Sequence, residues 1–175
     1  MDNIEKELEA GRAVILPTET VYGIFAKALD QEAVDYIYEL KRRPRDKALN
    51  LNVADEKTIR IYSKNQPSYL TKLIHSFLPG PLTIILQANE KVPNWIHSGL
   101  DTVGFRIPAH PKTLELIRKY GPLVGPSANL SGHASGTKYR AIVSEFDQVV
   151  PGIEDDDFLT GQDSTILDIS SSKSR

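Results

Sequence analysis

A cluster of basic residues is the clearest candidate for chemistry: the stretch "KRRPRDK" at 41–47 holds Lys41, Arg42, Arg43, Arg45 and Lys47. Lys41 and Arg42 lie at the expected end of a helix, where cations complement exposed carbonyl groups. The other three lie where the chain leaves that helix and enters a strand, so the helix end does not explain them. Several cations that converge on a turn suit a polyanion such as a triphosphate. The cluster therefore predicts either a solvated helix end or an anion site.

A second candidate is the loop "GPSANLSGHASG" at 125–136, which follows an expected strand. Its glycine, serine and asparagine residues are common in surface turns, and they also form loops whose amides and hydroxyls approach a ligand closely. The order of residues in "GHASGTK" excludes a Walker A motif. The stretch also lacks the nucleophile elbow of α/β-hydrolases, because Asn129 stands where the second glycine of that motif belongs. In addition, His133 follows Ser127 by only six residues, and the later histidine of such enzymes is absent. We therefore do not expect a serine hydrolase.

Polar residues also gather near two expected strands. "PTETVYGI" at 17–24 follows a buried strand, and ligands gather at strand ends in α/β sheets. In "TVGFRIP" at 102–108, strand alternation places Thr102, Gly104 and Arg106 on one face. Arg106 is either an ordinary exposed residue or, with Thr102 beside it, a contact for a carboxylate or phosphate.

The histidines and the acidic run give no sign of a metal site. The four histidines, at positions 75, 97, 110 and 133, lack the spacing of metal ligands. His75 falls in an expected helix, where a structural role is favoured. The acidic run "EDDD" at 154–157 is typical of a solvated loop. We therefore predict no metal site built by the protein.

The composition excludes several classes of function. The chain has 175 residues and a formal net charge of −2, so it has no overall attraction to nucleic acid or acidic membranes. It has no cysteine, which excludes disulfides, thiolate zinc sites and cysteine nucleophiles. The N-terminus lacks the apolar core of a signal peptide, and the runs "AVIL" and "LTIIL" are too short to span a bilayer. We expect a cytoplasmic protein without membrane contact.

Helical and strand-like patterns alternate along the chain. Helices are expected at 3–10 with Asp2 as the cap, at 31–42 with Asp30 as the cap, and at 67–78, 112–120 and 138–146. Strands are expected at 12–17, 48–54, 83–88, 102–108, 122–125 and 164–170. Pro44 should end the second helix at the basic cluster. Residues 48–54 alternate apolar residues with asparagine, as in a strand with one polar face. Interleaved helices and strands predict an α/β fold, a single domain over residues 1–175 with a mixed parallel and antiparallel sheet.

Five stretches, in this order, resemble the YrdC-domain family of threonylcarbamoyl-AMP synthases: "LPTETVYGI", "LKRRPRDKAL", "GFRIPAHP", "GPSANLSG" and "STILD". Each stretch is weakly specific alone, but together they cover nearly the whole chain. The resemblance implies a twisted mixed sheet, with flanking helices, around a large positively charged cavity. It also implies a reaction in which L-threonine, bicarbonate and ATP give threonylcarbamoyl-adenylate and pyrophosphate.

The implied reaction explains why cations are needed. Threonine's amine captures carbon dioxide as a carbamate, an anion that needs no general base when it attacks the α-phosphate. Arginine and lysine, helped by Mg²⁺ carried on the ATP phosphates, screen the repulsion between carbamate and triphosphate. Partner proteins are then expected to transfer the threonylcarbamoyl group to the adenosine beside the tRNA anticodon.

The resemblance also implies roles for individual residues. The signature catalytic set is Lys41, Arg43, Ser127 and Asn129. ATP is expected to contact Arg43, Lys47, Thr102, Ser127 and Ser135. Threonine is expected to contact Thr20, Asn52, Arg106 and Ser164, with Arg106 at its carboxylate. Some family members carry a histidine at the position of Asn52. Members also usually continue beyond "STILD" to another strand with an arginine near the nucleotide; either that element is missing from this sequence, or Arg175 substitutes poorly for it.

Two other interpretations stay open. A paralogue with the same fold could use another acyl or carbamoyl substrate. The related domain in hydrogenase maturation belongs to a longer chain that contains cysteine, and the lack of cysteine here argues against it. An RNA-binding module could hold tRNA or double-stranded RNA in the basic cavity. The chain has no aromatic-rich basic motif for base stacking, and its net charge is negative, so the enzyme is favoured.

Overall fold

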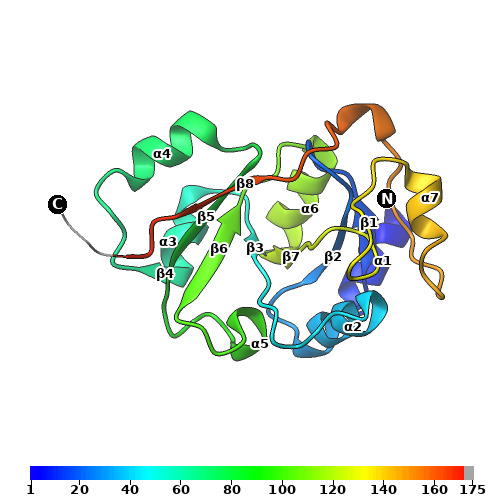
Figure 1. Cartoon of the computed structure of the whole chain (residues 1–175), viewed down its shortest axis with the longest axis horizontal. Coiled ribbons are helices and arrows are strands. Elements are labelled where there is room, and N and C mark those ends of the chain that lie inside the picture. Colours follow the sequence, from blue (N-terminus) through cyan, green and yellow to red (C-terminus); the bar gives the residue numbers. More distant parts are fainter. Residues whose placement is uncertain (172–175) are drawn as a thin grey trace.

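A mixed sheet is the frame of the protein (Figure 1). The computed structural model describes residues 1–171. Within them, the strands are β1 (Val14–Leu16), β2 (Gly23–Lys27), β3 (Leu51–Asn52), β4 (Ser63–Lys64), β5 (Leu82–Ala88), β6 (Thr102–Arg106), β7 (Leu123–Val124) and β8 (Thr165–Asp168). Their order is β1-β2-β7-β3-β6-β5-β4, with β8 paired to β5. The β3–β6 and β5–β8 pairs are parallel and the others antiparallel, so the predicted α/β fold with a mixed sheet is confirmed.

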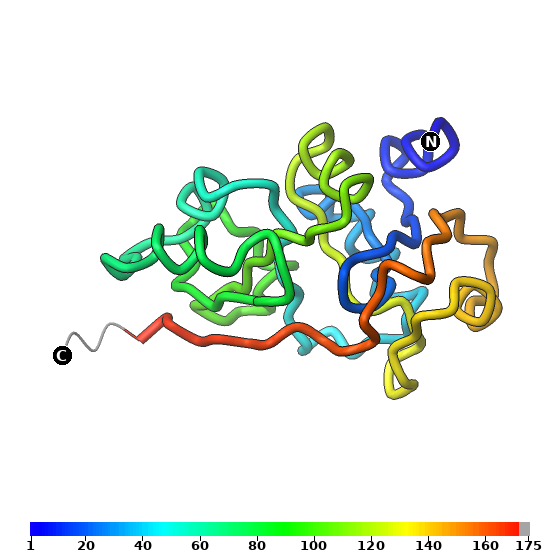
Figure 2. The backbone as a smooth tube through the Cα atoms, turned by 90° about the horizontal axis from the view of Figure 1, so that it is seen from above, coloured from blue at the N-terminus to red at the C-terminus, as the bar shows by residue number. Residues whose placement is uncertain are grey.

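Helices flank this sheet. They are α1 (Asp2–Glu9), α2 (Gln31–Lys41), α3 (Glu56–Tyr62), α4 (Leu70–Phe77), α5 (Asn94–His97), α6 (Pro111–Tyr120) and α7 (Tyr139–Val143), with a 3₁₀ turn at Asp156–Phe158. Figure 2 shows α6 and the segment that contains β8 on opposite sides of the molecule. No helix within residues 1–171 combines the length and the apolar character needed to cross a membrane.

Strand β1 is apolar throughout because both of its faces are covered. Val14 and Leu16 pack in one cluster with residues of α1 and α6, and Ile15 belongs to the larger cluster on the other face. A strand buried on both faces reads as a continuous apolar run rather than an alternating one. This explains the "AVIL" run, and it makes β1 a rigid start for the polar segment that follows.

Helix α2 contains the first residue of the basic cluster, and the rest of the cluster connects this helix to β3. The Asp30 carboxylate accepts hydrogen bonds from the amides of Glu32 and Ala33, which caps the helix start. The helix ends at Lys41, and Arg42 adopts a left-handed conformation with φ of +52°. The predicted end of the helix at the basic cluster is confirmed. Because Arg42 reverses the chain, the residues that follow it turn back toward the sheet.

The predicted strand at 48–54 is mostly extended chain, with a regular ladder only at β3. Leu49, Leu51 and Val53 are buried, and the side chains of Asn50 and Asn52 face a cavity, as the alternation predicts. Before the ladder, Leu49 N–H donates to Ile96 O, outside the sheet, and after it Val53 N–H continues the pairing with β6 by donating to Arg106 O. The asparagine side of this segment is the side that lines the cavity.

Several elements differ from the sequence prediction. β2, β4, α3 and α5 were not expected, and β2 pairs with β1 as an antiparallel hairpin. Asp2 does not cap α1: the helix starts at Asp2 and has no side-chain cap. Helix α4 begins at Leu70 rather than at Pro67. These elements are short, so they carry little periodicity, and contacts with distant segments decide them.

Candidate active site

A cavity of about 320 Å³ opens on the polar face of the sheet, within the size range of small-molecule sites. Six separate parts of the chain contribute to its wall, which includes Thr18, Thr20, Tyr22, Arg43, Asn50, Asn52, Thr83, Arg106, Ser127, Ser135, Asp163 and Ser164. The structure thus brings together these predicted residues: Thr20, Arg43, Asn52, Arg106, Ser127, Ser135 and Ser164. Lys41, Lys47, Thr102 and Asn129 do not line this cavity, and Arg175 lies outside the described residues.

Lys41 is buried behind the cavity wall rather than exposed at a helix end. Its side chain is 2% exposed. The ammonium donates hydrogen bonds to Ser127 O at 2.5 Å, to Asn129 O at 2.7 Å and to Asn129 Oδ1 at 2.8 Å. All three protons of Nζ are therefore used. Lys41 holds the 127–129 turn in place, and it has no proton left for a phosphate.

The structure predicts an unusual titration for Lys41. Burial, followed by the positive charge of Arg43, lowers the pKa of Lys41 from 10.5 to about 8. The ε-carbon NMR signal of Lys41 should therefore titrate near pH 8, below the other lysines. The unfolded chain keeps this proton to higher pH, so the contribution of Lys41 to the free energy of unfolding should rise as pH increases above 8. Titration of Lys41 together with the exposed lysines would contradict this burial.

Arg43 is the cation of the basic cluster that reaches the cavity. Its Nη2 donates to Ala48 O at 2.7 Å. Its Nε–H is buried and has no acceptor within residues 1–171. A buried unpaired donor is rare in proteins, and a bound ion, an ordered water molecule or local strain is the usual reason for one.

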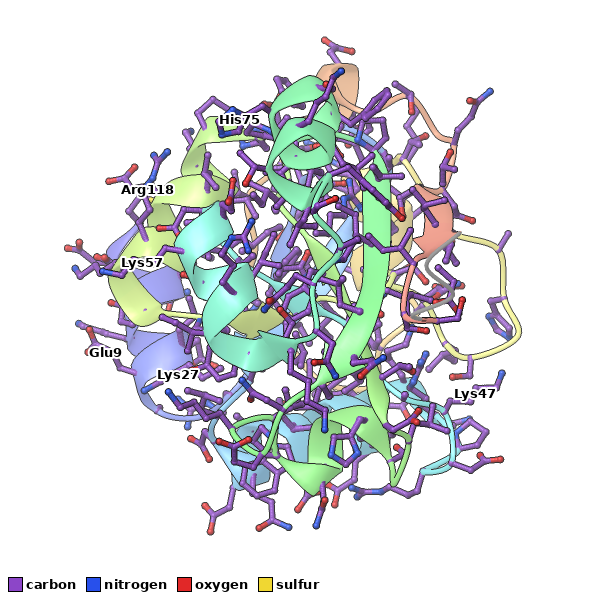
Figure 3. All side chains as sticks on the ribbon, turned by 90° about the vertical axis from the view of Figure 1, so that its left-hand side faces the viewer. Glu9, Lys27, Lys47, Lys57, His75 and Arg118 are labelled. Carbon is purple, nitrogen blue, oxygen red and sulfur yellow. The ribbon has the colours of Figure 1, made fainter. Side chains whose placement is uncertain are left out.

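The other cations of the cluster are directed away from the cavity. Arg42 pairs with Asp147 at 3.0 Å, and both side chains are largely exposed. Arg45 pairs with Asp35 at 2.5 Å and lies over the Tyr38 ring. Lys47 is exposed at the outer edge of the molecule (Figure 3). The cluster is therefore not one anion site, because most of its charges are on the surface.

Arg106, on β6, also lines the cavity, and it pairs with Glu19, a residue to which the sequence analysis gave no role of its own. The guanidinium Nη2 forms an ion pair with Glu19 Oε1 and donates to Thr20 Oγ1 at 3.0 Å. The other oxygen of Glu19 accepts from Ala109 N–H at 2.5 Å. Arg106 Nε is the second buried donor without an acceptor within residues 1–171. The alternation of threonine and glutamate in "PTETV" was the available signal for Glu19.

Ser127 and Asn129 form one hydrogen-bonded unit with Lys41. Ser127 Oγ donates to Asn129 Oδ1 at 2.9 Å, and Asn129 Nδ2 donates to His133 O at 2.5 Å. Since the single hydroxyl proton of Ser127 is used, Ser127 can donate to a phosphate only after it leaves Asn129. Ser127 is on the cavity wall, whereas Asn129 is buried behind it.

The remaining predicted residues lie on the cavity wall or in the sheet beside it. The hydroxyls of Ser164 and Thr83 are 2.9 Å apart on the cavity wall. Asn52 is buried, and its amide is 3.4 Å from Leu123 O. Thr102 is half-buried beside Gln87 in the β5–β6 ladder.

The acidic run 154–157 is exposed or half-buried, and two of its residues also have protein partners, which the prediction of a solvated loop did not include. Asp155 Oδ2 is 2.8 Å from Nε2 of the buried His110. Asp156 Oδ1 accepts from the Tyr22 hydroxyl at 2.7 Å and from Tyr139 N–H at 2.9 Å. Burial and this bond to Asp156 raise the pKa of Tyr22. Asp155 and Asp156 thus connect this run by hydrogen bonds to residues that lie far from it in the sequence.

The charge of the cavity is modest. Among the wall residues in the described chain, Arg43, Arg106 and Asp163 are charged, and Glu19 pairs with Arg106. Within residues 1–171, no three histidine, cysteine, aspartate or glutamate side chains gather in the manner of a metal site. The wall suits an anionic ligand at two separate arginines rather than one dense cationic patch.

Comparison with known proteins decides the family. A family model for Sua5, YciO and YrdC proteins, described as telomere recombination, matches residues 6–175. The chain belongs to this family. The threonylcarbamoyl-AMP synthase of Pyrococcus abyssi is 40% identical over 164 residues, 93% of this chain and 48% of that protein. The threonylcarbamoyl-AMP synthase of Bacillus subtilis is 40% identical over 150 residues, 85% of this chain and 43% of that protein.

A solved structure shows the same fold. The crystal structure of P. abyssi Sua5 complexed with L-threonine is 38% identical and superposes with a TM-score of 0.88, over 96% of this chain and 50% of that one. The Sua5/YciO/YrdC fold of the present chain is therefore established. The chain spans about half the length of these relatives.

Proposed function

We propose that this chain makes threonylcarbamoyl-adenylate and pyrophosphate from L-threonine, bicarbonate and ATP. The observation that carries the proposal is the pair of cavity arginines, Arg43 and Arg106, each with a buried Nε–H that lacks an acceptor within residues 1–171. Two anionic groups in the cavity would pair with these two guanidinium groups. The names of the relatives, and the threonine complex of P. abyssi Sua5, support threonine and ATP as the source of these groups.

On the nucleotide side, Arg43, Ser127 and Ser135 would face the phosphates. The carbamate oxygen of carboxylated threonine would form a bond to the α-phosphorus, and the bond from that phosphorus to pyrophosphate would break. Arg43 is held by Ala48 O, so it is already in place to stabilise charge on the departing pyrophosphate. Mg²⁺ would enter with ATP as part of the substrate, where it screens the negative charge of the phosphates.

On the amino-acid side, Arg106 would pair with the threonine carboxylate, and Thr20, Asn52 and Ser164 would surround the side chain. Glu19 and Thr20 hold the guanidinium in one orientation. A preorganised arginine loses little entropy when it binds a carboxylate. Glu19 is therefore assigned to the orientation of Arg106 rather than to the reaction itself.

The proposed roles of the remaining signature residues follow from their positions. Lys41 and Asn129 would act through the 127–129 turn that they hold, without contact to the phosphates. Lys47 and Thr102 do not line the cavity, so we leave them out of the proposed ATP site. We further propose that the product leaves for partner proteins that modify tRNA, and that this takes place in the cytoplasm.

Pyrophosphate release by the purified chain tests the proposed function. With ATP, Mg²⁺ and bicarbonate, release should require L-threonine and should fall when bicarbonate is removed. L-valine should be a poor substrate, because a site built for a hydroxyl rejects an analogue that lacks it. Equal turnover with threonine, serine and valine would contradict the assignment. No turnover, together with RNA binding that weakens steeply with salt, would favour an RNA-binding module.

Replacement of Arg106 by lysine should raise the threonine KM while the ATP KM stays close to its original value. Lysine keeps the charge but loses the planar pair of donors that matches a carboxylate. Loss of one charged hydrogen bond is worth about 1.5–3 kcal/mol, or roughly a 10- to 100-fold change in KM. The two KM values are measured by initial rates of pyrophosphate release. An unchanged threonine KM would place Arg106 outside the threonine site.

A further inference from the structure

Thr18 is a buried hydroxyl on the cavity wall that has no role in the site described above. It lies in the segment between β1 and β2 and is 3% exposed. Its Oγ1 is 2.7 Å from Val21 O, 3.1 Å from Thr20 N and 2.9 Å from Thr20 Oγ1. Thr20 in turn is 1% exposed and accepts from Arg106. The two threonines thus form a connected polar pair.

The positions of the protons in this pair follow from the partners. A backbone carbonyl only accepts, so Thr18 must donate its single hydroxyl proton to Val21 O. Thr18 therefore accepts from the Thr20 amide and from the Thr20 hydroxyl. Thr20 donates its own proton to Thr18 and accepts one from Arg106 Nη2. Thr20 Oγ1 therefore keeps one lone pair that can accept a hydrogen bond, and it has no proton left to donate.

We infer that Thr18 is a positioning residue that fixes Thr20 as a hydrogen-bond acceptor in the amino-acid pocket. A ligand group at Thr20 must then donate a hydrogen bond. The hydroxyl of threonine can do so and the methyl group of valine cannot. The inference rests on the proposed function for the identity of the ligand, and it assigns the preference for a hydroxyl-bearing amino acid to the Thr18–Thr20 pair.

Binding of L-threonine and L-valine, measured by calorimetry on the whole chain without ATP, tests this inference. Valine has nearly the shape of threonine but lacks the donor. The wild-type chain should prefer threonine. Thr18→Val should weaken threonine binding about 5- to 10-fold, the value of one neutral hydrogen bond, and should change valine binding little. Thr18→Ser keeps the hydroxyl and should restore the preference.

Thr113→Val is the matched control. Thr113 is fully buried in α6 and donates to Pro17 O at 2.6 Å. It therefore holds the segment that contains Thr18 without lining the cavity. Its loss should lower stability but leave the ratio of threonine to valine affinity unchanged. The inference is overturned if Thr18→Val leaves that ratio at the wild-type value, or if Thr113→Val changes it equally.

Two further measurements distinguish a variant that does not fold, a wrong proposed function and a wrong inference. If Thr18→Val does not fold, a neutron structure of the wild-type chain decides, because it locates hydroxyl deuterium atoms directly. Deuterium of Thr20 directed at Thr18 Oγ1 supports the inference, and deuterium of Thr20 directed into the cavity overturns it. Wild-type protein that prefers threonine in binding but releases no pyrophosphate would contradict the proposed function alone. Turnover with an unchanged ratio in Thr18→Val would contradict the inference alone.

Discussion

Replacement of Lys41 by methionine is expected to remove most pyrophosphate release and to lower the free energy of unfolding by about 1–3 kcal/mol. Methionine has a similar length but no donor, so Asn129 O loses its donor within the described chain. Ser127 O keeps the Asn129 amide, and Asn129 Oδ1 keeps the Ser127 hydroxyl. Each buried group left unsatisfied costs about 1–3 kcal/mol. Displacement of the turn by about 1 Å can cost on the order of a hundredfold in rate. Urea unfolding and initial rates measure the two effects.

The Lys41 result also separates two roles for this residue. A direct contact with phosphate predicts a loss of activity with intact stability and an intact 127–129 turn. The structure predicts that both are lost, and that amide hydrogen exchange rises in the segment 127–131. Lys57→Met on the exposed surface of α3 is the control for loss of one lysine charge, and it should change neither quantity. Full activity and stability in Lys41→Met would remove Lys41 from the site.

Arg43→Ala is expected to lower kcat by on the order of a hundredfold or more, since a single well-placed group that stabilises developing charge has this effect. The variant should stay folded, because the hydrogen bond of Arg43 within the described chain is to one carbonyl, Ala48 O. Its matched control is the neighbouring Arg42→Ala, which should keep near-normal turnover. Arg42 forms an exposed pair with Asp147, and such pairs are worth about 0–1 kcal/mol.

The kcat values of Arg42→Ala and Arg43→Ala are compared at saturating ATP. Circular dichroism checks that both variants are folded. If Arg42→Ala and Arg43→Ala lose activity mildly and alike, the basic cluster acts only through its diffuse charge. The proposed contact between Arg43 and the phosphates would then be wrong. A large loss in Arg43→Ala but not in Arg42→Ala would show that the effect of these two neighbours depends on their positions and not on charge alone.

Local patterns predicted a substantial part of this fold. Asp30 and Pro44 determine the two ends of α2 through a cap and a steric restriction, both of which act within a few residues. The alternation of leucine and asparagine at 49–52 places the leucines in the core and the asparagines at the cavity because strand side chains alternate in direction. The short elements β2, β4 and α5 were missed, since too few residues form them to show a period.

What the sequence by itself determined is the family, the mixed sheet and the set of polar segments that meet at the cavity. Only the tertiary structure decided which side chains of those segments reach it. By local rules Lys41 and Arg42 are equivalent cations at a helix end, yet one is buried by carbonyls that lie 86 and 88 residues further along the chain, and the other pairs with Asp147 on the surface. Glu19 and Arg106 likewise meet across 87 residues. The role of a polar side chain depends on the groups that form hydrogen bonds with it in place of water. For these residues, folding brings those groups from distant parts of the chain.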